Sequence, residues 1–219
     1  MRVVTWNVQH GRRADTGEPD PLALAGECMA FEADVIALQE VDRCTARVRG
    51  ADLLEIVADA TGLIPVDGPA VEFQGGTYGN ALLVRDEPTT PVVVELPRPW
   101  RAEPRVVVMC RIDGLVLACC HLGLGRGEAA RQLGAVLTAL PHGRAVLLGD
   151  LNIGPPSVSA VLSALDGSWS QVEVPAAFPA EDPQHAIDHV LVRGVQGTAA
   201  PGWYRPAVSD HRPIVVEVE

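Results

Sequence analysis

Ala145-Val146-Leu147-Leu148-Gly149-Asp150-Leu151-Asn152 is the stretch from which the fold can be read. Four apolar residues predict a buried strand, and the glycine interrupts it. In an extended segment, residues two positions apart point to the same side, so Asp150 and Asn152 are predicted to face one substrate together. Asp150 would serve as a base or metal ligand, and Asn152 as a neutral hydrogen-bond partner. The alternative is an ordinary turn, in which Asp and Asn are common.

The composition limits the class of protein. The chain has 219 residues and is 47% hydrophobic, which predicts one domain over residues 1–219 with a sizeable core. Its 17 Lys and Arg against 28 Asp and Glu give a formal net charge of −11. Proteins that bind DNA through its phosphates usually carry the opposite sign. The acidity fits a soluble protein and equally fits a carboxylate-lined metal site, so it does not distinguish these two possibilities.

The cysteines and the chain's first residues indicate a compartment. Five cysteines without a Cys-x-x-Cys pair predict reduced thiols in small core positions. The chain starts directly with a strand-like segment and has no apolar run of membrane-spanning length. We therefore expect a cytoplasmic location and no membrane span.

Hydrophobic periodicity and turn residues predict a chain with more strands than helices. Asp113-Gly114 is a two-residue hairpin signal. Gly75 to Asn80 is expected to form a flexible turn, and 194–206 an irregular segment. Helices are expected over 20–32, 51–61, 126–140 and 157–165, the last with Ser157 as its cap. Strands are expected over 2–8, 34–40, 81–84, 92–96, 105–112, 115–121, 145–150, 186–192 and 214–218.

Polar residues recur at or near the ends of the apolar segments. They are Asn7, Glu40, His121, Asp150, Asn152, Asp188, Asp210 and His211. Strand ends can converge on one rim of a sheet-based fold, and acids gathered there repel one another unless a cation balances them. Hard oxygen ligands favour Mg²⁺, with Mn²⁺ as a substitute. Two histidines beside such a metal indicate phosphoryl chemistry.

Each of these residues also has a structural alternative. Asn7 can cap a loop, and Glu40 can be a solvated acid. His121 can be a satisfied core histidine, and Asp188 can pair with an arginine. Their joint placement favours function.

In this ordered set the chain resembles the endonuclease/exonuclease/phosphatase superfamily, also called deoxyribonuclease-I-like. The matching segments run from the first strand to the last. They are Thr5-Trp6-Asn7-Val8, Leu38-Gln39-Glu40-Val41, Gly79-Asn80-Ala81-Leu82-Leu83, Cys120-His121-Leu122, Gly149-Asp150-Leu151-Asn152, Ile187-Asp188-His189-Val190 and Ser209-Asp210-His211-Arg212-Pro213. The chain departs from the family in its short length, in His189 where a tyrosine is common, and in lacking basic, aromatic insertion loops.

The resemblance implies an α/β (α+β) fold: a four-layer α/β/β/α sandwich of two mostly antiparallel sheets with helices outside. It also implies a role for each of the matching polar residues. Glu40 is the first metal ligand, supported by Asn7 and Asp210. Asp150 aligns and deprotonates water, while Asn80, Asn152 and His121 bind substrate. His211, oriented by Asp188, acts at the phosphate.

The expected function is Mg²⁺-dependent hydrolysis of a phosphodiester or phosphomonoester, on a small or lipid-linked substrate. One alternative is a DNA endonuclease or exonuclease, for which seven loop arginines offer a local basic rim. They are Arg43, Arg47, Arg49, Arg98, Arg101, Arg105 and Arg126. The other is a catalytically inactive binding module on the same fold, although such relatives usually lose the terminal Asp-His pair or the Gly-Asp-x-Asn segment, and both are present in this chain.

Overall fold

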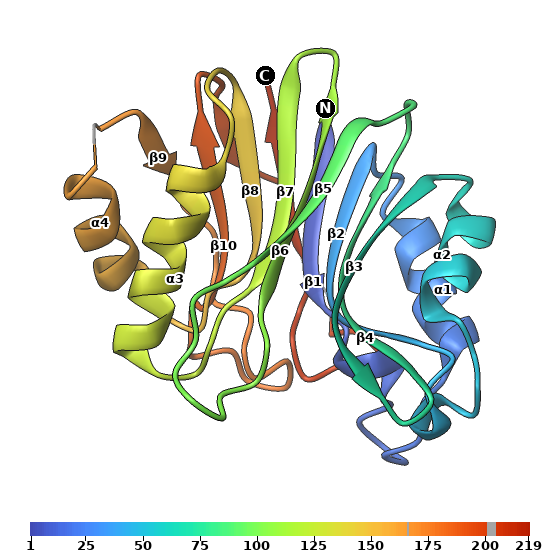
Figure 1. Ribbon diagram of the computed structural model, residues 1–219. Coiled ribbons are helices and arrows are strands. Elements are labelled where there is room, and N and C mark those ends of the chain that lie inside the picture. Colours follow the sequence, from blue (N-terminus) through green and yellow to red (C-terminus); the bar gives the residue numbers. More distant parts are fainter. Residues whose placement is uncertain (166, 201–204) are drawn as a thin grey trace.

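The computed structural model describes residues 1–165, 167–200 and 205–219. Within these ranges the chain forms two six-stranded sheets that face each other (Figure 1). Helices α1 and α2 cover the outer face of one sheet, and α3 and α4 cover that of the other. The predicted four-layer α/β/β/α sandwich is confirmed.

The first sheet has the order β11-β12-β1-β2-β4-β3. Strands β1 and β2 run parallel, and the other neighbouring pairs are antiparallel. The elements of this half are β1 (Arg2–Asn7), α1 (Pro21–Ala30), β2 (Val35–Arg43), α2 (Leu53–Thr61), β3 (Ile64–Phe73), β4 (Gly76–Val84), β11 (Gly197–Ala199) and β12 (Ile214–Val218), with short 3-10 turns η1 (Gln9–Gly11) and η2 (Ala46–Val48).

The second sheet has the order β5-β6-β7-β8-β10-β9. Here β7 and β8 are the parallel pair. The elements of this half are β5 (Thr89–Glu95), β6 (Val106–Ile112), β7 (Leu115–His121), α3 (Arg126–Ala139), β8 (Ala145–Asp150), α4 (Pro155–Ser163), β9 (Trp169–Gln171) and β10 (Asp188–Arg193). The Asp113-Gly114 hairpin joins β6 to β7 as predicted.

The parallel pairs decide which polar residues meet. Parallel strands need a crossover connection, which α1 supplies between β1 and β2, and α3 between β7 and β8. Both strands of each pair therefore end at the same edge of their sheet. Asn7 lies opposite Gln39 in one pair, and His121 lies opposite Asp150 in the other. Since the two sheets face each other, these four ends converge on one end of the sandwich.

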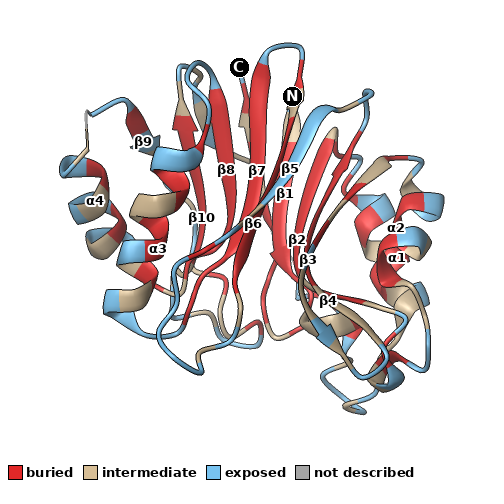
Figure 2. Cartoon of the chain, in the orientation of Figure 1, coloured by how far each residue is buried: buried red, intermediate tan, exposed pale blue. Residues whose placement is uncertain are grey.

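Apolar side chains fill three spaces between the four layers. Leu82, Leu117 and Leu148 are among the side chains that lie fully buried between the sheets. Leu24, Leu54 and Ile36 belong to the cluster under α1 and α2, and other apolar residues fill the space under α3 and α4. Figure 2 shows the central strands buried along most of their length. In the described part of the chain, no helix is long and apolar enough to cross a membrane.

Two helices begin with an aspartate cap. Asp20 caps α1 by accepting a hydrogen bond from the Ala23 amide, and Asp52 caps α2 through the Glu55 amide. The prediction for α4 was wrong. Two prolines open this helix at Pro155, Gly154 is its N-cap, and Ser157 lies inside it. Proline tolerates the first helical turn because its missing N–H has no helical partner there.

Several strand boundaries also differ from the prediction. Strand β2 continues to Arg43 rather than ending at Glu40, and β4 begins at Gly76, so only Gly75 of the predicted flexible turn lies outside a strand. A Cβ at Gly79 would lie 2.2 Å from the Gly68 carbonyl oxygen, so glycine allows a close strand approach here. The short β9 was not predicted. The segment 194–206 contains β11, and its residues 201–204 lie outside the described residues.

The cysteines are free thiols. Cys28, Cys110, Cys119 and Cys120 are buried, as the prediction of small core positions requires. Cys44 is exposed, so for this residue the prediction was wrong. It follows β2 in the loop before η2, where φ is +57°.

Candidate active site

Asn7 joins the two sheets at the end of the sandwich where the strand ends converge. Its Nδ2 donates to Glu40 Oε1 and to Asp150 Oδ2, at 3.1 Å in both cases. Glu40 belongs to the first sheet and Asp150 to the second. One buried carboxamide thus holds two carboxylates from opposite sheets at a common point.

Asp150 is the most connected of the buried acids. Besides Asn7, its carboxylate accepts the Asn152 amide at 3.0 Å. The Nε2 atoms of both His121 and His211 lie near Oδ2, at 3.5 and 3.8 Å. Burial, followed by the charge of Asp188 on the adjacent strand, raises the pKa of Asp150 to about 7. A carboxyl group with a pKa near neutrality is suited to general-base work.

His211 forms a buried pair with Asp188. Its Nδ1 lies 2.9 Å and 3.1 Å from the two carboxylate oxygens of Asp188. Burial opposes the charged imidazole, but the charge and hydrogen bond of Asp188, with Asp150 and Asp210 nearby, raise the pKa of His211 to about 9. His211 is therefore an imidazolium at neutral pH, and its free Nε2–H points towards Asp150.

His121 has a different environment. Its Nδ1 lies 3.1 Å from Nη1 of Arg105, and both residues are buried. Burial, with the charges of Arg105 and His211, lowers the pKa of His121 well below its ordinary value. The site thus contains one charged and one neutral imidazole.

Glu40 and Asp210 form the side of the site nearest the first sheet. Glu40 lies on a bulge of β2 between Leu38 and Val41, with a φ of +59°. A bulge redirects a side chain, and such backbone strain concentrates at functional sites. Burial, and then the charge of Asp210, raise the pKa of Glu40 against the opposing hydrogen bond from Asn7. Asp210 accepts a hydrogen bond from Gln9 Nε2 at 3.0 Å.

The extended geometry predicted for Asp150 and Asn152 was wrong, and the structure shows the turn that was the alternative. Strand β8 ends at Asp150, and Asn152 has a φ of +53°, so the two residues do not share an extended segment. The chain instead turns, with the Asp150 carboxylate accepting the Asn152 amide. Asn152 Nδ2 donates to the Leu122 carbonyl at 2.9 Å, which ties this turn to the end of β7 and leaves its second amide hydrogen available.

Asn80 serves the fold at this end of the sandwich. Its Nδ2 donates to the Val106 carbonyl, so it joins β4 of the first sheet to β6 of the second. It also lines a small hollow with Arg105 and His121. Asn80 lies beside the site, and the bond to Val106 occupies one of its two amide hydrogens.

The donor set fits a hard divalent cation. The carboxylates of Glu40 and Asp150 meet at Asn7, and the charge of Asp210 acts on Glu40. Burial and neighbouring acids raise the pKa values of Glu40 and Asp150. Excess buried negative charge of this kind is relieved by a cation with oxygen ligands. Oxygen and nitrogen atoms of Asp150, Asp188 and His211 also lie within 4.8 Å of one another. Asp188, however, uses both of its carboxylate oxygens on His211 Nδ1.

Several supporting residues were missed by the sequence analysis. Ser209 accepts the His211 amide and donates to the Asn7 carbonyl, and Trp6 Nε1 donates to the His211 carbonyl. The ring of Phe178 lies 4.7 Å from that of His211 between centroids. Ser209 and Trp6 belong to the segments that resemble the family, but no role was predicted for them. No sequence pattern around Phe178 or Gln9 indicated that they would contact the site.

His189, which departs from the family pattern, has a structural place. Its Nε2 lies 2.7 Å from the Ile153 carbonyl and its Nδ1 lies 3.2 Å from Gln171 Nε2. Burial lowers the pKa of His189, which keeps the ring neutral. It thereby fixes the chain just after Asn152 and takes no direct part in the site.

Comparison with known families agrees with this geometry. A model described as "Endonuclease/Exonuclease/phosphatase family" matches residues 4–211, nearly the whole chain. The chain belongs to this family. Its members are phosphoester hydrolases that depend on divalent metal ions, so this protein is a phosphoester hydrolase. A search of curated proteins found no significant match.

Solved structures of the family share the fold. An endonuclease/exonuclease/phosphatase from Beutenbergia cavernae is 22% identical, with a TM-score of 0.78 over 100% of this chain and 71% of that one. The mannosyl-6-phosphatase Bt3783 from Bacteroides thetaiotaomicron is 17% identical, with a TM-score of 0.74 over 100% and 99%. Humanized D. rerio TDP2 is 18% identical, with a TM-score of 0.70 over 100% and 98%.

Proposed function

We propose that this protein is a Mg²⁺-dependent phosphodiesterase acting on a small or lipid-linked phosphoester, with Mn²⁺ able to replace Mg²⁺. The observation that carries the proposal is the convergence of buried acids and two unlike histidines around Asp150. Glu40 and Asp210 would hold the cation, with Asn7 in support. When bound, the cation supplies charge neutralisation at the phosphate and lowers the pKa of water.

The protein's own groups divide the remaining work. Asp150 orients the attacking water and takes its proton, for which a pKa near 7 is suitable. His211, charged and held by Asp188, protonates the leaving oxygen or stabilises the charge that develops on the phosphate. His121 and Asn152 donate hydrogen bonds to the non-bridging phosphate oxygens. Asn80 lies near enough to support the substrate from the side of β4.

The charge pattern at this end favours a small substrate over duplex DNA. Binding to DNA is built largely from Lys and Arg on phosphates. Four of the loop arginines instead form ion pairs: Arg43 with Asp52 and Asp67, Arg47 with Asp42, Arg49 with Glu18, and Arg105 with Glu103. Each of these arginines thus has a carboxylate partner, and the net charge of the chain is −11.

A hollow beside the site offers room for the organic part of such a substrate. It has a volume of about 390 Å³ and is lined by Arg47, Val71, Phe73, Tyr78 and Glu103. The Arg47 guanidinium stacks on both rings, 4.7 Å from Phe73 and 5.0 Å from Tyr78. Tyr78 also lines the small hollow that contains His121, so the two spaces share a wall. Apolar and aromatic walls suit an uncharged organic group better than a second phosphate.

A substrate panel tests the proposal. Purified protein with Mg²⁺, and separately with excess chelator, is assayed on generic phosphodiesters and monoesters, nucleotides, phospholipid headgroups and supercoiled plasmid at moderate salt. We expect Mg²⁺-dependent release from a small diester and weak plasmid nicking. Efficient nicking without small-diester hydrolysis would replace this proposal by the nuclease alternative. Binding without turnover of any compound would favour the inactive binding module.

A further inference from the structure

Arg105 is a buried cation that the functional assignment above leaves without a role. It directly precedes β6, and only 8% of its surface is exposed. Its Nη1 lies 3.1 Å from His121 Nδ1 and 3.1 Å from Glu103 Oε1. Its Nε is buried and has no hydrogen-bond partner among the described residues.

The chemistry of arginine fixes what His121 does in this contact. A guanidinium in a protein stays protonated and only donates hydrogen bonds. The Nδ1 of His121 is therefore the acceptor of the Arg105 hydrogen bond, since Glu40 Oε1 lies farther from this nitrogen, at 4.0 Å. The single proton of the neutral ring is then on Nε2. That Nε2 faces Asp150 Oδ2 at 3.5 Å, so it lies at the proposed reaction site.

The two histidines of the site are thus oriented by partners of opposite charge. Asp188 faces Nδ1 of His211, and a carboxylate there stabilises the charged ring. Arg105 faces Nδ1 of His121, and a guanidinium there stabilises a neutral ring that accepts at Nδ1. Both arrangements present an Nε2–H towards Asp150.

We propose that Arg105 is a positioning residue that holds His121 as the Nε2–H tautomer, so that the ring always offers a donor to a phosphate oxygen. The contact with phosphate rests on the proposed function, whereas the tautomer does not. A purely structural role would leave Arg105 well satisfied. Instead its Nε has no partner among the described residues, and its carboxylate partner Glu103 is half exposed, with 49% of its side chain accessible.

Nuclear magnetic resonance of histidine-labelled protein tests the tautomer without any substrate. In long-range ¹H–¹⁵N spectra of metal-free protein near neutral pH, His121 is assigned by the signals that disappear in His121→Gln. We expect the pattern of a pure Nε2–H tautomer. Arg105→Met removes the donor with little loss of volume and should give a mixed or Nδ1–H pattern. Arg105→Lys keeps a donor that cannot accept, so it should retain the wild-type pattern.

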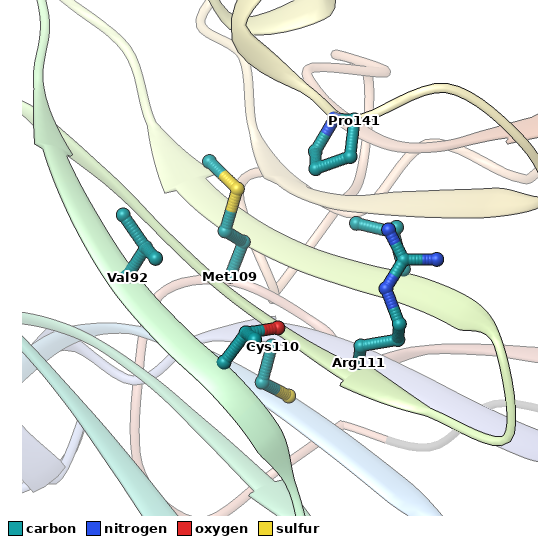
Figure 3. A pocket seen from close by; sticks show the side chains of 7 residues that line it. Val92, Met109, Cys110, Arg111 and Pro141 are labelled. Carbon is teal, nitrogen blue, oxygen red and sulfur yellow. The ribbon is translucent and has the colours of Figure 1, made fainter.

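The matched control is Arg111→Met at the other end of β6. Arg111 lines a hollow with Val92, Met109, Cys110 and Pro141 (Figure 3). It pairs with Val116 near the start of β7, whereas His121 ends that strand. Its Nη1 donates to the Gly114 carbonyl. This variant should leave the His121 signals unchanged. An unchanged Nε2–H pattern in folded Arg105→Met protein would overturn the proposal, and thermal unfolding of each variant shows that the comparison is between folded proteins.

A double-mutant cycle on an active substrate adds a second test. Arg105→Met should lower kcat by about 10- to 100-fold, the scale seen when a partner that orients a functional histidine is removed. KM should change less, and Arg105→Lys should recover part of the rate. In the His121→Gln background, Arg105→Met should cost little more, because its effect passes through His121. If the two substitutions lower kcat additively, Arg105 does not act through His121. Absence of activity on every substrate would remove the proposed function and leave the tautomer result standing.

Discussion

The two ends of β6 make an instructive contrast. At one end, the hollow around Arg111 has a volume of about 280 Å³, and its neighbours include Val92, Met109 and Pro141. At the other end, Arg105 lies beside a small hollow with hardly any free space. Yet the second end holds the buried acids and both histidines. Of these two hollows, the larger therefore lies away from the chemistry of this protein. The end of the molecule with the proposed chemistry is distinguished instead by buried charge that the fold leaves unbalanced.

Removal of the cation should have the largest effect at the end that holds the acids. We expect excess chelator to abolish hydrolysis, and Mg²⁺ or Mn²⁺ to restore it, because Glu40, Asp150 and Asp210 would otherwise repel one another and the phosphate. Glu40→Gln should raise the Mg²⁺ concentration needed for half-maximal rate, since a neutral amide replaces a charged ligand. Metal-dependent rates on an active small diester are the measurement. Full turnover in excess chelator contradicts the metal assignment.

The next largest effect is expected at His211. His211→Ala should lower kcat by at least ~10²-fold while the protein remains folded, because the charged donor beside Asp150 is lost. Asp188→Asn should cost less, since the ring remains and only its orientation and charge are weakened. Arg111→Met at the opposite end is the matched control and should keep the wild-type rate. Near-normal turnover by His211→Ala would show that the assigned role is wrong.

These contrasts also show what the sequence can predict. Apolar runs located most strands, and the polar residues Asn7, His121 and Asp150 near their ends were predicted to meet at one rim. The structure gives the reason, because the strands of each parallel pair end together. The pattern could not show the bulge at Glu40, which depends on how β2 pairs with β4. It also left a turn at Asn152 as an alternative to an extended segment, because the contact that decides for the turn, between the Asp150 carboxylate and the Asn152 amide, cannot be seen in the sequence.

Other parts of the site were beyond sequence reasoning for a different reason. Arg105 and Phe178 lie 16 and 33 positions from the histidines that they contact, and no periodicity connects such pairs. Gln9 lies just after the first strand, and the end of that strand was predicted well. Its contact with Asp210, however, joins residues near opposite ends of the chain. The boundaries of α4 failed because a serine cap was given more weight than two prolines.

A core substitution should lower stability and leave the rate unchanged, the opposite of what is expected for His211→Ala. Leu148 lies on β8 two residues before Asp150 and is fully buried between the sheets. Leu148→Ala should lower the free energy of unfolding by about 2–5 kcal/mol, through lost burial and the cavity left behind. The kcat of the protein that remains folded should stay near that of the wild type. Denaturant unfolding together with rates below the transition measures both. A loss of rate comparable to that of His211→Ala, with little change in stability, would contradict the division along this strand.

The smallest expected effect is a gain in stability at Asp150, opposite in sign to the loss at Leu148. In the folded state the pKa of Asp150 is raised to about 7 from its ordinary value of 3.8. The folded protein therefore binds more protons than the unfolded chain between these values, so this carboxyl group lowers stability as the pH rises from about 4 to 7. Asp150→Asn removes that penalty together with the proposed base. Without metal, the variant should melt about 2–4 °C above the wild type at pH 8, a shift that corresponds to roughly 1 kcal/mol for a chain of this size. The difference should shrink at pH 5, where the folded wild-type carboxyl group is largely protonated.

Mg²⁺ should raise the melting temperature of the wild type more than that of the variant, because only the wild type gains a balanced charge. Thermal unfolding at both pH values, with chelator and then with Mg²⁺, measures all three differences. A melting difference that is flat between pH 5 and 8 would mean that the charge of Asp150 is already balanced by His121, His211 and Asn7, and the catalytic end would then need no cation to hold its acids together.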